Sequence, residues 1–326
     1  MSDTFSFSII QQAAERLKGK IVRTPLLESP MLNQAAECRV LVKAESLQRT
    51  GAFKYRGALN KLLSLPSDVL QRGVVAFSSG NHGHAVAAAA AQAGCPAVIV
   101  MPKDAAVIKI ENCRWWGAEI VLYDPITEDR EEVARRVAGP RNMLVVPPFD
   151  DYDIIAGQGT AGIELAEQLT EEGIRPDAFI VPCSGGGLSS GTITAMKHAY
   201  PDLPCFFVEP SGLEKMAPSV RDGIPHKRPS GPATIMDGLS GPIAGTRTTR
   251  ILRDAGGVGL SVSDDDVLDA MAAAFRSLKL VLEPAGAASL AALLQKKADF
   301  QGKNVAIVCS GGNVDPSVFI GALHAS

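Results

Sequence analysis

The 326-residue chain is poor in aromatic side chains and has no strong excess of charge of either sign. Aromatic residues make up 5% of it, and 32 Lys and Arg against 35 Asp and Glu leave a formal net charge of -3. This balance gives no basic surface for nucleic-acid phosphates and no run of like charge for an anionic membrane. We therefore expect a small-molecule partner, with no nucleic acid and no membrane.

Closely spaced cysteines and long apolar runs are also missing. The six cysteines form no C-x-x-C pair and no zinc-binding spacing with histidine, so we expect buried free thiols. No stretch reaches about 20 consecutive apolar residues, and the first residues do not form a basic segment followed by an apolar one. These absences predict a cytoplasmic protein without a membrane span.

The chain does contain a repeated alternation of short apolar runs and helical patterns. The β-prone runs occupy residues 40–42, 74–77, 97–101, 119–122, 178–181, 206–208 and 305–308. Helical spacing occupies residues 81–93, 107–116, 128–137, 160–169, 188–198, 264–279 and 286–296. Because parallel strands need crossover connections, this order predicts an α/β fold with mostly parallel sheets covered by helices. Residues 210–249 are rich in proline, glycine and charge and show no clear period.

Two polar motifs stand where a loop or strand meets a helical pattern. Lys54 lies between Gly51 and Gly57. A buried, neutral lysine amine can form a Schiff base with a carbonyl, although most lysines in such a position are solvated. The second motif, Ser78-Ser79-Gly80-Asn81-His82-Gly83-His84, follows the predicted strand 74–77. Its polar groups at a helix N-terminus could cradle a carboxylate, and an ordinary helix cap is the alternative.

Two further turns follow predicted strands. In Cys183-Ser184-Gly185-Gly186-Gly187-Leu188 the missing side chains let successive N–H groups wrap a phosphate. A dinucleotide site competes, because Glu209 ends the next strand where a ribose-binding acid would lie. The G-x-G-x-x-G register fails, since Ser190 occupies its last position. The turn that begins at Ser310 could direct a hydroxyl at a heterocyclic nitrogen, or be a simple β-turn.

Together the motifs supply an amine, a carboxylate cradle, a phosphate site and a partner for a ring nitrogen, which is the set that pyridoxal phosphate chemistry requires. Over essentially its whole length the sequence resembles fold-type II pyridoxal-phosphate enzymes, specifically the threonine/serine dehydratase and serine racemase family. The resemblance implies a tryptophan synthase β-like α/β fold with two twisted, mostly parallel sheets. It is carried by the motifs S-x-x-x-x-G-A-F-K-x-R-G-A around Lys54, S-S-G-N-H-G from Ser78, A-G-Q-G-T from Ala156, S-G-G-G-L from Ser184, E-P-A-G-A from Glu283 and S-G-G-N-V-D from Ser310.

The resemblance implies roles for individual residues. Lys54 would form the Schiff base with the cofactor and act as general base, and Ser79 stands where racemases exchange a proton on the opposite face. Pyridoxal 5'-phosphate would be bound by Phe53, Lys54, Asn81, Gly185, Gly186, Gly187, Leu188 and Ser310. The substrate would be bound by Ser78, Ser79, Asn81, His82 and, through a second carboxylate, Arg130. Among the metal ligands of some members only Glu209 is matched, because Lys215 stands at an expected acid, so we expect no metal.

The implied activity is that of a lyase in amino-acid catabolism. Such an ammonia-lyase (dehydratase) converts a β-hydroxy amino acid such as L-threonine or L-serine to a 2-oxo acid and ammonia, with serine racemization as a side activity. A hydroxyaspartate or aryl-serine dehydratase is the alternative. A cysteine synthase-like β-replacement enzyme is more distant, because those relatives usually carry S-G-N-T-G where this chain has residues 79–83.

The resemblance also implies a domain organisation. Residues 1–64 and 149–326 would form a large cofactor-binding domain, and residues 65–148 a small domain that closes over substrate. The chain ends soon after the S-G-G-N motif, so we expect no regulatory domain and no isoleucine feedback. A homodimer is expected by analogy.

Overall fold

The computed structural model describes residues 5–231 and 233–325; residues 1–4, 232 and 326, which fall in the predicted large domain, lie outside the described residues. The strands are β1 (Leu26–Leu27), β2 (Arg39–Ala44), β3 (Val74–Phe77), β4 (Ala97–Pro102), β5 (Glu119–Tyr123), β6 (Leu144–Val145), β7 (Ala178–Pro182), β8 (Cys205–Pro210), β9 (Val258–Val262) and β10 (Asn304–Cys309). The α-helices are α1 (Phe7–Leu17), α2 (Pro30–Ala36), α3 (Lys54–Ser64), α4 (Ser67–Arg72), α5 (Asn81–Ala93), α6 (Val107–Trp115), α7 (Arg130–Arg141), α8 (Tyr152–Glu171), α9 (Gly187–Ala199), α10 (Met216–Asp222), α11 (Thr246–Asp254), α12 (Asp264–Leu278), α13 (Pro284–Leu294) and α14 (Pro316–Ala325). Short 3-10 helices are η1 (Glu45–Leu47), η2 (Arg49–Gly51) and η3 (Asp237–Leu239).

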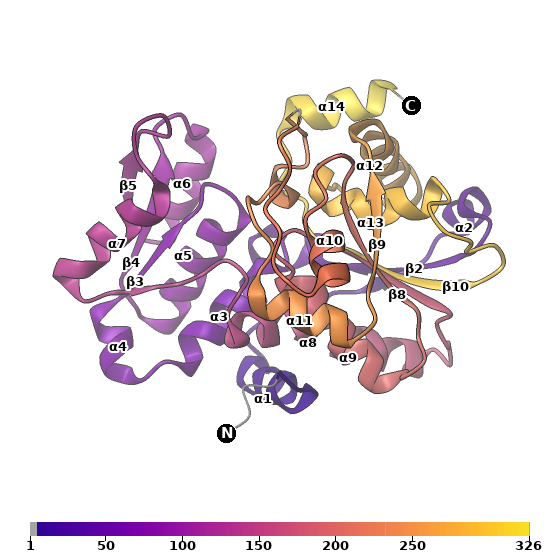
Figure 1. The fold of residues 1–326 in the computed structure, drawn as a ribbon, viewed down its shortest axis with the longest axis horizontal. Helices are drawn as coiled ribbons and strands as arrows, with labels where there is room; N and C mark the ends of the chain where they lie inside the picture. Colours follow the sequence, from indigo (N-terminus) through magenta and orange to yellow (C-terminus); the bar gives the residue numbers. More distant parts are fainter. Residues whose placement is uncertain (1–4, 232, 326) are drawn as a thin grey trace.

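The strands form two separate sheets. One has six strands in the order β1-β2-β10-β7-β8-β9, and the other has four in the order β5-β4-β3-β6. All neighbouring strands run parallel except β1, which is antiparallel to β2. In Figure 1 the four-stranded sheet lies at the left with α4 to α7, and the six-stranded sheet lies at the right. The predicted α/β fold with two mostly parallel sheets covered by helices is confirmed.

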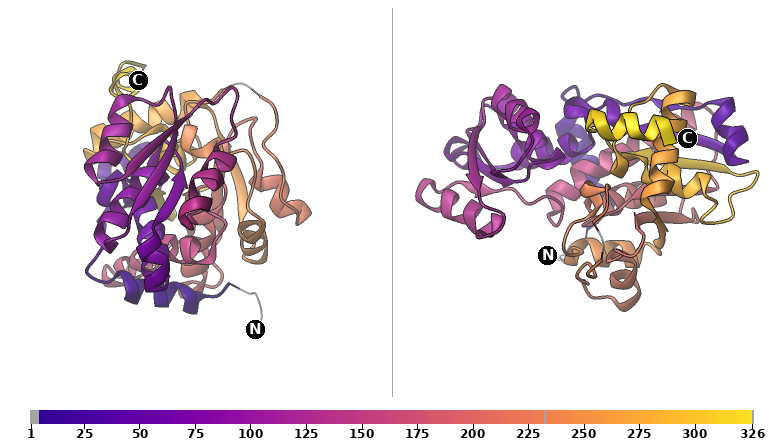
Figure 2. Two further views of the ribbon diagram at one scale, coloured as in Figure 1. Left: turned by 90° about the vertical axis from the view of Figure 1, so that its left-hand side faces the viewer. Right: turned by 90° about the horizontal axis from the view of Figure 1, so that it is seen from above.

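The large sheet is assembled from segments far apart in the chain. β10 lies between β2 and β7, with Ala306 opposite Leu41 on one side and Phe179 on the other. Seen from above in Figure 2 (right), the indigo and yellow segments lie together, and the purple four-stranded sheet stands apart from them. The loops after β2, β7 and β10 therefore meet at one edge of the sheet, where open α/β sheets bind ligands.

The central strands are apolar and buried because helices cover both faces of the sheets there. All five residues of β7 are buried, and so are the last five of β10. Parallel strands covered on both sides carry continuous runs of Val and Ile in place of an alternating pattern. α13 is buried along almost its whole length within the six-stranded half of the protein.

Small residues let the central helices approach one another closely. A Cβ on Gly157 of α8 would lie 2.6 Å from the Cα of Gly57 in α3. A Cβ on Gly191 of α9 would lie 2.3 Å from the carbonyl oxygen of Ile155 in α8. The A-G-Q-G-T motif thus allows α8 to pack tightly between the helices that begin at Lys54 and at the glycine-rich turn.

Several elements of the structure are not predicted by the sequence patterns. β1 and β6 have only two residues each, and α10 has seven and contains Pro218, so no period can develop in them. The segment 210–249, predicted without a clear period, contains α10, η3 and the start of α11. The six cysteines are free and buried, as expected. Within the described ranges, every helix is too short or too polar to cross a membrane.

Candidate active site

Lys54 opens α3 beside the end of β10. The backbone N–H of Phe53 donates to the carbonyl of Ser310 at 3.0 Å, and Ala52 forms an antiparallel bridge with Gly311. The Lys54 Nζ donates to the carbonyl of Pro148 at 2.7 Å and lies 5.3 Å from the Phe53 ring centroid. Loss of water around the amine lowers the pKa of Lys54 to about 8. The structure thus brings together a lysine with an easily neutralised amine and the buried Ser310.

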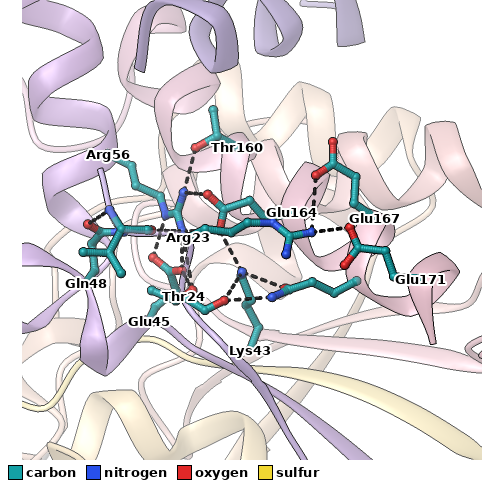
Figure 3. Close-up of polar contacts among 12 residues, drawn as sticks. Arg23, Thr24, Lys43, Glu45, Gln48, Arg56, Thr160, Glu164, Glu167 and Glu171 are labelled. Carbon is teal, nitrogen blue, oxygen red and sulfur yellow. Dashed lines mark hydrogen bonds and ion pairs between the residues drawn. The ribbon is translucent and has the colours of Figure 1, made fainter. Parts of the chain in front are cut away.

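A buried ionic network fixes the start of α3 (Figure 3). Arg56 donates from Nε to Glu45 and from Nη1 to Glu164, each at 2.7 Å, and Lys43 Nζ also donates to Glu164 at 2.7 Å. The side chains of Arg56, Glu45 and Lys43 are fully buried. Removing one partner of such a network typically costs about 3–5 kcal/mol. β2, η1, α3 and α8 are therefore held in one arrangement two residues beyond Lys54.

The glycine-rich turn leads from β7 into α9 and excludes side chains. Gly186 has a φ of +92°, and a Cβ there would lie 2.6 Å from the Cβ of Thr248. A Cβ on Gly185 would lie 2.4 Å from the ring of Phe149. The first N–H groups of a helix have no acceptor within the helix, so this turn is suited to an anion such as phosphate. The residues concerned are buried: Gly185, Gly186, Gly187 and Leu188.

The predicted carboxylate cradle stands at the N-terminus of α5, across from Lys54. Ser78 and Ser79 are half-buried, and Ser78 Oγ accepts the N–H of Gly80 at 3.1 Å. The His82 ring is buried, and its Nε2 donates to the carbonyl of Val146 at 3.1 Å. Burial, and next the positive charge of Lys54, lower the pKa of His82 to about 3. His82 is therefore neutral, and its ring nitrogen Nε2 is already engaged with the Val146 carbonyl.

The side-chain amide of Asn81, at the first position of α5, is held on both sides. Its Nδ2 donates to Glu283 Oε1 at 2.6 Å, and its Oδ1 accepts from Asn313 Nδ2 at 2.7 Å. Asn313 Nδ2 also donates to the carbonyl of Thr50 at 2.7 Å. Nδ2 of Asn81 has a second proton free to donate to another acceptor. These contacts join α5 to the segments that carry Lys54 and Ser310.

Glu283 is the site residue to which sequence reasoning assigned no role beyond its motif. Its carboxyl is buried directly before α13, and burial, with a smaller effect of Asp237, raises its pKa to about 8. The sequence does contain a signal for the burial of Glu283, because an acid immediately before an almost wholly apolar helix has little solvent around it.

Arg130 opens α7 and contacts the last residue of β3. Its guanidinium carbon is 5.7 Å from the ring centroid of Phe77, the last residue of β3, and its side chain is exposed. Arg130 is thus next to the end of β3, which Ser78 follows.

The dinucleotide interpretation of Glu209 does not agree with the structure. The Glu209 carboxylate is buried and accepts the backbone N–H groups of Lys215, Met216 and Ala217 at 2.8–2.9 Å. It therefore caps α10 and is unavailable to a ribose. The Lys215 Nζ donates to the carbonyl of Leu239 at 2.9 Å. The described part of the chain contains no group of three or more His, Cys, Asp or Glu that could hold a metal ion.

The arrangement fits pyridoxal phosphate, because a buried amine, an anion-binding turn and a free amide proton surround one edge of the large sheet. A family model described as "Pyridoxal-phosphate dependent enzyme" matches residues 17–311. The chain belongs to this family. As a pyridoxal-phosphate-dependent enzyme it uses that cofactor, and the predicted family is confirmed.

Its relatives place it among the ammonia-lyases of the family. It is 42% identical to an L-threo-3-hydroxyaspartate ammonia-lyase of Pseudomonas sp, over 95% of this chain and 96% of that protein. It is 39% identical to the Saccharomyces cerevisiae protein of the same name, over 95% and 94%. The crystal structure of a threonine deaminase from T.th. superposes with a TM-score of 0.90 at 40% identity, covering 95% of this chain and 99% of that one.

Proposed function

We propose that this enzyme dehydrates L-threo-3-hydroxyaspartate and releases ammonia and a four-carbon 2-oxo diacid. The observation that carries the proposal is Arg130, a cation beside the end of β3 where the Ser78 cradle begins. A substrate whose α-carboxylate occupies the cradle would present its second carboxylate to this guanidinium. The two relatives that bear this activity in their names support the same substrate over L-threonine and L-serine, which the sequence alone favoured.

The proposed roles of the residues follow from their positions. When bound, pyridoxal phosphate withdraws electrons from the substrate's α-carbon and makes the α-proton acidic. Lys54 takes that proton, because its buried amine is neutral in a large fraction of molecules near pH 8. The substrate α-carboxylate is held by Ser78, Ser79, Asn81 and the backbone of His82. The cofactor is held by Phe53, Lys54, Asn81, Gly185, Gly186, Gly187, Leu188 and Ser310.

The atoms balance without a further reagent. The β-hydroxyl leaves as water with the α-proton that Lys54 removed. One water molecule then returns when the unsaturated product hydrolyses to the 2-oxo acid and ammonia. The net reaction converts the hydroxy amino acid to these two products only.

We further propose that residues 65–148 act as a small domain that closes over substrate held by residues 1–64 and 149–326. The four-stranded sheet, which lies within residues 65–148, carries the Ser78 cradle, and the six-stranded sheet carries Lys54 and Ser310. We propose a cytoplasmic homodimer as the working form.

L-Threonine and L-serine form a second candidate substrate class, supported by the similarity to threonine deaminase. Neither substrate would use Arg130. Because Ser79 lies in the cradle at the start of α5, we propose that it returns a proton to the opposite face of the α-carbon, which would racemise serine slowly.

The test is a substrate panel on the purified holoenzyme. Ammonia and 2-oxo acid release are measured for threo- and erythro-3-hydroxyaspartate, serine, threonine and phenylserine, each as both enantiomers. The proposal predicts the highest kcat/KM for L-threo-3-hydroxyaspartate. Higher values for L-threonine or L-serine would reverse the ranking.

The Arg130→Met variant tests the basis of the preference. Losing a charge-assisted contact should lower kcat/KM for hydroxyaspartate about 10- to 100-fold and leave that for L-serine nearly unchanged. Arg135→Met is the matched control, because Arg135 is another exposed arginine of α7. An equal loss on both substrates would show that Arg130 does not recognise the second carboxylate.

A further inference from the structure

Glu283 joins the two sheets of the protein through Asn81. Glu283 precedes α13, which packs on the large sheet, and Asn81 opens α5, which packs on the small one. Their hydrogen bond of 2.6 Å therefore connects the part of the protein around the large sheet with the part around the small sheet. A Cβ on Gly311 would lie 2.2 Å from Glu283 Oε1, so the carboxyl also fills the space left by that glycine, next to Ser310.

The carboxyl has few compensating charges around it. Asp237 of η3 is a like charge that raises its pKa, whereas Lys109 of α6 lowers it, and Asn81 is the neutral group facing it from α5. Lys109 is itself drawn toward Asp237, with 3.9 Å between Nζ and Oδ2. The loop at Gly311 contributes backbone only. Burial is the largest influence, so Glu283 keeps its proton at neutral pH, with a pKa of about 8.

We propose that Glu283 is a positioning residue that holds the Asn81 amide toward the cofactor's ring hydroxyl while it is protonated, and that its ionisation weakens cofactor binding. This inference rests on the proposed function, in which Asn81 helps to hold the cofactor; we assign its second Nδ2 proton to the ring hydroxyl. A neutral carboxyl accepts the Asn81 proton without adding charge to the site. An ionised one places a negative charge one amide away from the ring oxygen, which is itself electron-rich.

The experiment measures the dissociation constant of pyridoxal phosphate from the full-length protein between pH 6.5 and 9.5, by equilibrium dialysis. The wild type should lose about tenfold in affinity, beyond any change shared by the variants, with a midpoint near pH 8. Glu283→Gln keeps the acceptor for Asn81 and cannot ionise. The affinity of this variant for pyridoxal phosphate should therefore not fall near pH 8. Titration of Lys54 also changes the affinity with pH, but it does so in every variant and therefore cancels when the variants are compared.

Two further variants make the outcome decisive. Asp237→Asn removes the like charge from an exposed position, and it should move the midpoint to lower pH even if Glu283→Gln fails to fold. In an Asn81→Ala background, replacing Glu283 should have no further effect on the pH dependence, because Glu283 acts on the cofactor only through Asn81. The proposal is overturned if the loss of affinity near pH 8 persists in Glu283→Gln, or if its midpoint does not move in Asp237→Asn. No amino acid is present, so an error in the proposed substrate would appear only in the lyase assays.

Discussion

The Lys54 amine is a nucleophile only while it is uncharged, and its surroundings set the pH at which this holds. Burial lowers its pKa to about 8 from 10.5, so half of the molecules carry a neutral amine at pH 8 and nearly all of them do about two pH units higher. The partner of the amine, the Pro148 carbonyl, accepts a hydrogen bond from the charged and the neutral form alike.

The rate of cofactor uptake should report this pKa. After removal of the cofactor, the rate at which added pyridoxal phosphate develops visible absorbance should rise about tenfold per pH unit below pH 8 and level off above it. Stopped-flow absorbance measures the rate. A rate still rising toward pH 10.5 would mean that the amine is not desolvated, and Lys54→Ala should give no visible band bleachable by borohydride.

Single residues differ in how far the sequence identifies them. Lys54, Asn81 and Ser310 are recognisable because motifs surround them. Glu283 shows its importance only in the structure, because its burial and its contact with Asn81 depend on two units meeting. The contact of the His82 ring with the Val146 carbonyl also depends on packing that no local pattern records.

Among the elements, the turn between β7 and α9 depends most on the absence of side chains. Gly186→Ala would add left-handed strain of about 1–2 kcal/mol and a clash with Thr248. We expect the dissociation constant of pyridoxal phosphate to rise about 100-fold, since displaced N–H groups lose charge-assisted bonds. Gly212→Ala is the control, because Gly212 has a φ of +77° and nothing within 4 Å of its Cβ position. Equal effects of the two changes on cofactor affinity would contradict this account.

Lys215 ties α10 to η3 through its side chain and its backbone. Its fully buried amine donates to the Leu239 carbonyl, and its own N–H binds Glu209. We predict that EDTA leaves the activity unchanged. Lys215→Ala should lower the free energy of unfolding by about 1–3 kcal/mol, because a buried carbonyl loses its donor. Lys279→Ala, which removes an exposed amine bound to the Arg276 carbonyl, should change it by less than about 0.5 kcal/mol, and chemical denaturation measures both.

The elements that sequence reasoning finds are those long enough to show a period. β3 and α5 agree with their predicted residues, because one is a buried β-branched run and the other is rich in alanine. α11 is missed because most of its nine residues are threonine, arginine or aspartate, and it is stabilised by packing against α9 and α10. Helix propensity alone does not determine such segments.

At the scale of the whole molecule, the segments that carry the two sheets contact each other in two ways: α3 packs on α5 through apolar side chains, and polar groups meet around the site. Asn81 reaches Glu283 and Asn313, and Lys109 approaches Asp237. An exposed pair such as Lys109 and Asp237 can form and break at little cost, as a closing domain would require. Their partners are distant in sequence, so the domain boundaries were predicted by resemblance and not from composition.

Closure makes a measurable prediction for hydrogen exchange. Adding malonate, a dicarboxylate without a reactive hydroxyl, to the holoenzyme should slow amide exchange in the first turns of α5 and α6 and leave α9 unchanged. Arg130→Met should weaken the effect, because the second carboxylate of malonate would lose the cation proposed to bind it. Slowing confined to the large sheet would contradict closure by residues 65–148.

The central place of β10 in the large sheet also governs how the protein is made. A ribosome adds about 5–20 residues per second, so β2 and β7 wait on the order of tens of seconds or less for the strand that separates them. The four-stranded sheet, complete by residue 145, can pair long before that. The nascent chain therefore carries a folded small sheet beside open strand edges, and it cannot capture its cofactor until translation has passed Ser310. The cofactor can therefore stabilise only chains that are nearly complete. The unpaired edges of β2 and β7 in incomplete chains need protection from aggregation by other means.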